Sequence, residues 1–364
     1  MPWNGMKFNS LKRRCFTVLL FALIPFFAVG CSDTKEKTTA ESSPDGINNI
    51  DCGGLSVSQG DTIYYVGEGD QGGEVIYAMD SAGENLRAVY TPERYLNWLS
   101  DLNIHDNRLY FCEAVINADF GQEETQINVL ELADLSVKKL YSSELLLPPI
   151  YFYKDHVYFG ESRPITNEAD IEADPYSDYQ LKVMDADGEN LITLLNYHEK
   201  FLVYDDMIYY ITIKGLSRCD LKGQGREFIY DDDNGIAGLQ VVDDRLYFVE
   251  YRNERASRFM SMDLDGGNPQ RVFWSEVRGG VYLANAKDHN IYLGTEEYVS
   301  VNLMATHLLT IRLDGSGKGT VVSREDKEIP GYVWPGWCVS GAWLFYAESD
   351  GHNGRVLYKE PWTK

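Results

Sequence analysis

The chain has 364 residues, is 13% aromatic with 25 tyrosines, and carries a formal net charge of −23. So large a negative charge excludes binding to nucleic acid or to anionic lipid head groups through electrostatic attraction. It is compatible with a cationic partner, with a divalent ion, or with solubility alone.

The first thirty residues have the pattern of an export signal. Four basic residues precede an apolar run from Cys15 to Val29, which is too short to span a bilayer comfortably. The tetrapeptide Ala28-Val29-Gly30-Cys31 resembles a bacterial lipobox, in which a peptidase cleaves before the cysteine and the thiol receives lipid. The resemblance implies a lipoprotein signal over residues 1–30 and lipidation of Cys31 with diacylglycerol and palmitate. An ordinary secretory signal and an uncleaved anchor are the alternatives.

Residues 31–50 are expected to form a disordered tether. They are polar, with almost no apolar side chain, and cannot bury enough surface to offset the entropy of ordering. A lipid on Cys31 would therefore hold the remaining chain, residues 51–364, near a cell membrane on its extracytoplasmic face.

Seven copies of one short motif run through residues 51–364. Each is an apolar residue followed by an aromatic pair or an aromatic–apolar pair, and the copies recur about every 45 residues. They are Ile63-Tyr64-Tyr65, Leu109-Tyr110-Phe111, Val157-Tyr158-Phe159, Ile208-Tyr209-Tyr210, Leu246-Tyr247-Phe248, Ile291-Tyr292-Leu293 and Leu344-Phe345-Tyr346. Because they occupy the same place in every unit, they are interpreted as packing residues rather than ligand sites.

Each unit contains four strand-like runs bounded by Asp, Asn and Gly, as residues 239–273 illustrate. This predicts an all-β fold, a β-propeller of four-stranded antiparallel blades, with seven blades and six as the alternative. The last unit offers only three runs. We therefore expect residues Ile47–Cys52 to supply its missing outer strand.

The repeated strand ending Met-Asp-x-Asp-Gly-x-Asn resembles the propeller of low-density-lipoprotein-receptor-related proteins over residues 53–360. It resembles uncharacterised bacterial lipoprotein propellers more closely, and TolB-type repeats more distantly. The chain lacks the Tyr-Trp-Thr-Asp consensus of the receptor family, because Tyr, Phe or Leu stands at the Trp position. The resemblance implies the fold and a binding role at the cell surface.

The cysteines show no metal-ligand spacing, and an extracytoplasmic location permits disulfides. Cys52 and Cys338 lie at opposite ends of the repeat array, which ring closure would bring together, so they form the candidate disulfide. Cys112 and Cys219 lie in strand-like runs and are expected to be buried free thiols.

No catalytic motif, metal site or cofactor is predicted. The run Gly315–Thr320 has the Gly and Lys of a phosphate loop but not its spacing, and it occupies a repeated turn. His105, His156 and His289 lie in or beside equivalent turns and are interpreted as turn residues. The Asp-x-Asp-Gly turns at Asp185 and Asp263 lack the remaining ligands of a calcium loop and are expected to be hairpins.

Two segments interrupt the repeat and are the candidate binding loops. The insertion Glu161–Tyr179 is acidic, and a solvated loop without function is the alternative. Glu296–Thr306 is either an apolar contact site or a longer strand pair. The candidate residues are Glu161, Glu168, Asp170, Glu172, Asp174, Tyr176, Asp178, Tyr179, Tyr298 and Met304.

These features predict a lipid-anchored propeller, a monomer acting as a non-catalytic protein- or peptide-binding or scaffolding module. A glycan-active enzyme with carboxylates in the propeller funnel is the alternative, since a fold does not determine a function. A purely structural surface protein is a third possibility.

Overall fold

The computed structural model describes residues 54–361, apart from 71–72, 95–96, 117–121, 163–178, 199, 232–234, 254–255, 276–280, 288–289, 301–302, 326–336 and 350–354. The regular structure in this part of the chain consists of β-strands. Within it, no helix is long and apolar enough to cross a membrane. The expected signal, the tether and Cys31 lie outside the described residues, and so does Cys52.

The strands form seven sheets. The first sheet contains β1 (Ser56–Gln59), β2 (Thr62–Glu68), β3 (Glu74–Asp80) and β4 (Arg87–Tyr90), and the second contains β5 (Trp98–His105), β6 (Arg108–Ile116), β7 (Gln122–Glu131) and β8 (Val137–Ser143). The third contains β9 (Leu146–Tyr153), β10 (His156–Ser162), β11 (Tyr179–Asp185) and β12 (Ile192–Tyr197), and the fourth contains β13 (Phe201–Tyr204), β14 (Met207–Thr212), β15 (Gly215–Asp220) and β16 (Glu227–Asp231).

The fifth sheet contains β17 (Ile236–Val242), β18 (Arg245–Asn253), β19 (Ala256–Asp263) and β20 (Gln270–Ser275), and the sixth contains β21 (Val281–Lys287), β22 (Asn290–Ser300), β23 (Leu303–Arg312) and β24 (Gly319–Glu325). The seventh contains β25 (Trp337–Ser340), β26 (Trp343–Ser349) and β27 (Arg355–Pro361). Successive strands pair antiparallel in every sheet, so each sheet is a simple meander.

Every aromatic motif lies in the second strand of its sheet. In β6, Leu109, Tyr110 and Phe111 are all fully buried, although neighbouring residues of a strand point to opposite faces. Both faces of the sheet must therefore be covered, which happens when a sheet is packed between two others. This confirms the interpretation of the motifs as packing residues.

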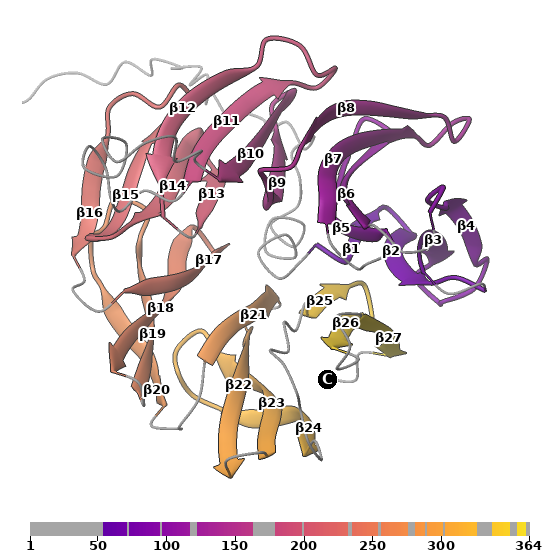
Figure 1. The fold of residues 1–364 in the computed structure, drawn as a ribbon. Helices are drawn as coiled ribbons and strands as arrows, with labels where there is room; N and C mark the ends of the chain where they lie inside the picture. The colour runs from indigo at the N-terminus through magenta and orange to yellow at the C-terminus, as the bar shows by residue number, and fades with distance from the viewer. Residues whose placement is uncertain are drawn as a thin grey trace, which may run out of the picture. The chain divides into compact units, whose positions relative to one another are not determined.

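The first strands of the sheets contact one another in a closed cycle. β1 contacts β5, β5 contacts β9, and the series continues through β13, β17, β21 and β25, which contacts β1 again. Figure 1 shows the sheets following one another around this ring. A ring of four-stranded meanders joined at their first strands is a β-propeller. The predicted architecture is confirmed with seven blades rather than the alternative six.

The ring closes between the first and the seventh sheets through side chains. The Ser56 and Ser340 hydroxyls are 2.9 Å apart, and the Leu55 amide donates to the Cys338 sulfur at 3.2 Å. The rings of Tyr65 and Phe345 pack with centroids 4.9 Å apart. The outer strand expected from residues 47–52 lies outside the described residues, so it stays a prediction.

The core is distributed between the sheets. One cluster of buried side chains combines Leu55 and Ile63 of the first sheet with Leu99 of the second and Phe345 of the seventh. Cys112 and Cys219 are buried free thiols, as predicted, and burial raises the pKa of Cys219 to about 11. The pairing of Cys52 with Cys338 stays a prediction.

Candidate functional site

The first and second strands of four blades are joined by two-residue turns with a shared geometry. Both turn residues have positive φ, for example 46° and 62° at Asp106 and Asn107. The same geometry is found at Lys154-Asp155, Asp205-Asp206 and Asp243-Asp244. Type I′ hairpin turns need positive φ at both positions, and Asp and Asn accept it more readily than most residues. This requirement places acidic side chains at equivalent points of successive blades.

The residue before three of these turns, His105, Tyr153 or Tyr204, reaches the second turn residue of the next blade. The Tyr204 hydroxyl donates to the Asp244 carboxylate at 2.7 Å. The Tyr153 hydroxyl lies 3.4 Å from the Asp206 carboxylate and accepts a hydrogen bond from the backbone amide of Asp206. His105 takes the equivalent place, with Nε2 3.4 Å from the Asp155 carboxylate. These three contacts join blades two to five at one end of their sheets.

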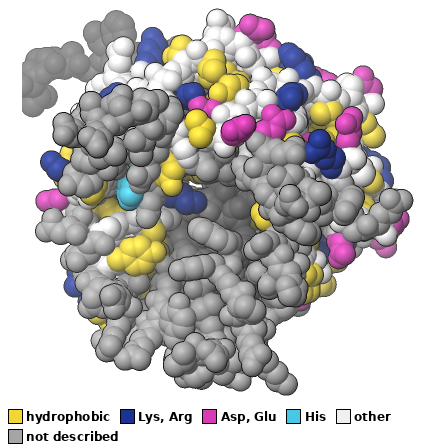
Figure 2. Space-filling view, viewed as in Figure 1, with side chains coloured by type: hydrophobic (Ala, Val, Ile, Leu, Met, Phe, Trp, Pro, Cys, Tyr) yellow, Lys and Arg dark blue, Asp and Glu magenta, His cyan; other side chains and the backbone are white. Residues whose placement is uncertain are grey.

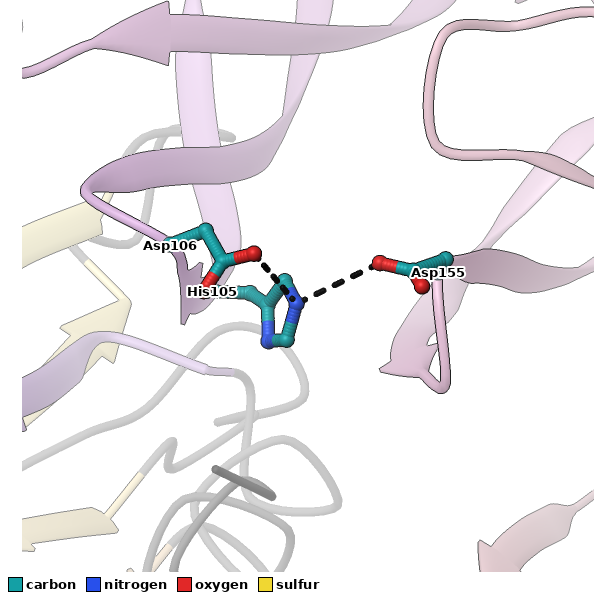
Figure 3. A group of neighbouring side chains, drawn as sticks. All are labelled: His105, Asp106 and Asp155. Atoms are coloured by element: carbon teal, nitrogen blue, oxygen red, sulfur yellow. Dashed lines mark ion pairs between the residues drawn. The ribbon is translucent and has the colours of Figure 1, made fainter. Parts of the chain in front are cut away.

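The His105 contact differs from the two tyrosine contacts because a second carboxylate shares it. Asp106, in the same turn as His105, lies 3.2 Å from the same nitrogen. Figure 3 shows the imidazole between the two aspartates, which come from the β5–β6 and β9–β10 turns. The His105, Asp106 and Asp155 ligand atoms all lie within 4.8 Å of one another. The arrangement has the composition of a metal centre, although no metal site was predicted.

The third and fourth strands are joined by turns whose carboxylates are engaged within the turn. Asp185 accepts from the Asn190 side chain at 2.6 Å, and Asp263 accepts in the same way from Asn268 at 2.6 Å. These are the two turns that share the first residues of a calcium loop. Because the aspartates hold the turn together, their recurrence follows from hairpin geometry.

A second repeated arrangement lies between blades, at buried glutamates four residues after the start of the aromatic motif. Glu113 accepts from Tyr90 at 2.5 Å, Glu161 accepts from Tyr141 at 2.5 Å, and Glu250 accepts from Tyr230 at 3.2 Å. Each tyrosine belongs to the fourth strand of the preceding blade. The same tyrosines pack on Phe111, Phe159 and Phe248, with centroids about 5 Å apart.

The predicted site residue Glu161 therefore lies in a blade junction rather than on an exposed loop. It is 5% exposed and pairs with Lys182. Burial alone would raise the pKa of its carboxyl, but hydrogen bonds from Lys182 and Tyr141 outweigh burial and lower the pKa. Glu161 was assigned to the insertion because the strand was expected to end at Gly160, whereas β10 continues for two more residues to Ser162.

The other predicted site residues have different outcomes. Tyr179 begins β11, and its ring packs on Tyr197 with centroids 5.4 Å apart. Tyr298 pairs with Met304 in the β22–β23 hairpin, so Glu296–Thr306 is the longer strand pair of the two alternatives. Glu168, Asp170, Glu172, Asp174, Tyr176 and Asp178 lie outside the described residues, and their role in binding stays a prediction.

Acidic side chains are widespread on the molecule. Figure 2 shows Asp and Glu side chains scattered over several sheets of the visible face, with Lys and Arg among them. A functional site must be argued from a specific arrangement of groups and not from the net charge.

No family model matches the chain, and no curated protein matches it. Among solved structures it resembles an uncharacterised protein from Listeria monocytogenes, with 15% identity, a TM-score of 0.52, and coverage of 86% of this chain and 94% of that one. It also resembles the β-propeller domain of the trilobed protease from Pyrococcus furiosus, which has an open velcro topology. There the identity is 14%, the TM-score 0.50, and the coverage 84% of this chain and 93% of that one.

A third similar structure is an acylaminoacyl peptidase, with 14% identity, a TM-score of 0.51 and coverage of 88% of this chain. The chain spans 54% of that peptidase's length, and 65% of the length of TolB from Acinetobacter baumannii, for which the TM-score is 0.48. At these identities the likeness shows the fold alone. The protein is a β-propeller protein, and its structural neighbours are TolB-like and other propellers.

The comparisons correct the predicted function. The prediction offered a non-catalytic binding or scaffolding module, with a glycan-active enzyme as the alternative. This predicted pair of functions is wrong, because the similar propellers include parts of a protease and a peptidase. The prediction did not include enzymes that act on polypeptide.

Proposed function

We propose that this protein recognises positively charged segments of polypeptide at the end of the propeller that carries the acidic turns. In a four-stranded meander, the turn after the first strand and the turn after the third strand lie at the same end of the sheet. We call this end of the blades the turn face. The proposal concerns recognition, and a chain with or without catalysis would satisfy it.

The observation that supports the proposal is the repetition of exposed carboxylates on the turn face. Asp205, Asp243 and Asp244 are exposed in the first turns of two successive blades, where Asp206 is exposed too but is paired with Lys154. Asp187 and Asp265 are exposed in the third-to-fourth strand turns of the third and fifth blades. Carboxylates held at fixed spacing attract lysine and arginine side chains and raise the rate of association.

Polypeptide is the partner class that the similar propellers favour. Two of them are named as parts of a protease and a peptidase, which act on polypeptide. The negative charge of the turn face favours segments of polypeptide that carry lysine and arginine.

The test is binding of a fluorescent lysine- and arginine-rich peptide to the full chain in detergent, followed by anisotropy. A glutamate-rich peptide of the same length is the first control. The turn variant combines Asp205→Asn, Asp243→Asn and Asp244→Asn, because asparagine keeps the positive φ that these turns need. The matched variant removes three exposed carboxylates from the opposite end of the blades, through Glu68→Gln, Asp70→Asn and Glu144→Gln.

We expect the turn variant to weaken binding of the basic peptide about tenfold, since each exposed ion pair contributes at most about 1 kcal/mol. The matched variant should change it less than about twofold, and added salt should weaken the wild-type complex. Equal losses in the two variants, or equal binding of the two peptides, would reject the proposal.

We further propose that the chain is a monomeric bacterial lipoprotein held by Cys31 at the extracytoplasmic face of the cell membrane. The support is the lipobox-like tetrapeptide and the polar tract after it, together with the resemblance to lipoprotein propellers. Cells fed a fatty-acid analogue should label the wild-type chain and not Cys31→Ala. Equal labelling of the two chains would exclude the anchor.

A further inference from the structure

His105 is the exception among three equivalent contacts between blades. At the other two junctions, a neutral tyrosine hydroxyl meets one carboxylate, at Asp206 and at Asp244. At the junction of blades two and three, an imidazole nitrogen meets two carboxylates, those of Asp106 and Asp155. An imidazole nitrogen is a common metal ligand, whereas a phenol is not ionised at neutral pH.

The two distances do not suit hydrogen bonds from a charged histidine. A charged N–H group donates to a carboxylate at about 2.7–2.9 Å, and the single proton on Nε2 can point at only one oxygen. The observed separations are 3.2 Å to Asp106 and 3.4 Å to Asp155. Two ligand atoms bound tetrahedrally to one ion at about 2.0–2.1 Å lie about 3.3 Å apart. The two separations from Nε2 lie near this value, and the three ligand atoms lie within 4.8 Å of one another.

The surroundings hold the imidazole in place. The ring stacks on Phe152 with centroids 4.5 Å apart and planes inclined by 29°, and its side chain is 18% exposed. The Asp106 and Asp155 side chains are 74% and 79% exposed, which leaves room for water to complete a coordination shell.

Two basic side chains next to the cluster are engaged elsewhere. Lys154 pairs with Asp206 at 2.5 Å, and Arg108 pairs with Glu131 at 2.7 Å. Neither of these two ion pairs includes Asp106 or Asp155.

We propose that His105, Asp106 and Asp155 bind a divalent transition-metal ion of the zinc class and join blades two and three through it. One imidazole nitrogen and two carboxylate oxygens suit zinc, nickel or copper, whereas calcium and magnesium prefer an all-oxygen shell. The ion uses the nitrogen Nε2 of neutral His105, one oxygen from each aspartate, and water in the remaining position. This proposed metal site is independent of the polypeptide recognition proposed above.

The test uses the full chain, without a histidine tag, in detergent and stripped of metal with a chelator. Zinc binding is measured by competition with a chromophoric chelator. The key variant is His105→Tyr, which converts this junction to the tyrosine contact that two other junctions already use and so preserves the fold. His156→Asn is the matched control, because His156 faces the single carboxylate of Asp185 at 3.4 Å.

We expect the wild type and His156→Asn each to bind one equivalent of zinc. His105→Tyr should bind zinc at least about tenfold more weakly. Zinc should raise the melting temperature of the first two proteins and not of His105→Tyr, because an ion that binds only the folded state stabilises it. Calcium should leave all three unchanged. Equal zinc affinity and stoichiometry in the wild type and His105→Tyr, or no zinc binding by the wild type, would overturn the proposal.

Discussion

At the scale of single residues, the most informative arrangement is the buried glutamate between blades. Glu113, Glu161 and Glu250 are 4%, 5% and 0% exposed, and each accepts a hydrogen bond from a tyrosine of the preceding blade. A buried carboxylate without partners would be costly, so these hydrogen bonds are a condition of the packing. Each glutamate thus fixes how one sheet is placed on the next.

Replacement of Glu161 by glutamine should make the protein less stable at neutral pH. The amide keeps the shape but leaves Lys182 without its carboxylate, and a hydrogen bond to a charged group is worth about 1.5–3 kcal/mol. Urea unfolding at pH 7 measures the loss. Glu227→Gln is the control, because the exposed Glu227–Arg218 pair should contribute less than about 1 kcal/mol.

The difference between the wild type and Glu161→Gln should narrow as the pH falls. The pKa of Glu161 is lowered in the folded state, so its contribution is complete above the unfolded pKa of about 4.3. It is lost as the pH falls through the lower folded pKa. A difference that stays constant from pH 7 to pH 3 would contradict the assigned role of the carboxylate.

At the scale of elements, the turn after the third strand packs on the fourth strand of the preceding blade. A Cβ on the turn glycine would meet that strand at Gly188, Gly223, Gly266 and Gly315, where the neighbours are Leu140, Leu194, Ile229 and Val272. The glycine is therefore required for the close approach between blades as well as for positive φ. At ring closure the seventh sheet has three described strands, and Trp343 of β26 takes this place against Gly83.

Replacement of Gly266 by alanine should cost more than replacement of Gly225. Both have positive φ, 87° and 62°, so each alanine has backbone strain of about 1–2 kcal/mol. Only Gly266 has a neighbour in the way, the Ile229 carbonyl, whereas nothing lies within 4 Å of a Cβ at Gly225. Unfolding midpoints in urea should separate the variants, and equal midpoints would show that the approach between blades is unimportant.

At the scale of the whole ring, closure depends on side chains because the first and the seventh sheets share no described strand. Phe345 is 1% exposed and packs on Tyr65 across this junction. The Trp343 indole also donates to the Ser81 carbonyl at 3.1 Å. Among the described residues, the seam is therefore a packed interface of side chains.

Truncation of Phe345 to alanine should destabilise the ring by about 3–5 kcal/mol, as expected for a large buried side chain. Phe228→Ala, at a position that is 49% exposed, should change stability by less than about 0.5 kcal/mol. Urea unfolding measures both. A loss at Phe345 no larger than that at Phe228 would mean that the closing junction contributes little.

The sequence was sufficient for the fold because every unit repeats the same strands and turns. The aromatic motif from Leu109 to Phe111 and its six counterparts identified the second strand of every sheet. The buried glutamates were also visible as a repeated Tyr-Phe-x-Glu at Glu113, Glu161 and Glu250. Their tyrosine partners come from the preceding blade, and pairing across blades requires the geometry of the ring.

The His105 cluster could not be predicted for a related reason. His105 and Asp106 are adjacent in sequence, but Asp155 is brought to them only when the second and third blades pack side by side. The clue was that His105, Tyr153 and Tyr204 all precede a two-residue turn. Comparing the repeats in this way identifies equivalent positions in the blades. It does not give the distance between the turns of neighbouring blades.

The way the ring closes has a consequence for how such a chain can be rearranged. Each sheet in the described part of the chain is built from one continuous stretch of sequence. A gene rearranged to begin at any blade boundary, with the old ends joined, would still encode seven intact sheets. Whole units can likewise be duplicated or exchanged in a gene without cutting a strand ladder. The continuity of each described sheet thus makes the blade the unit of inheritance as well as of packing.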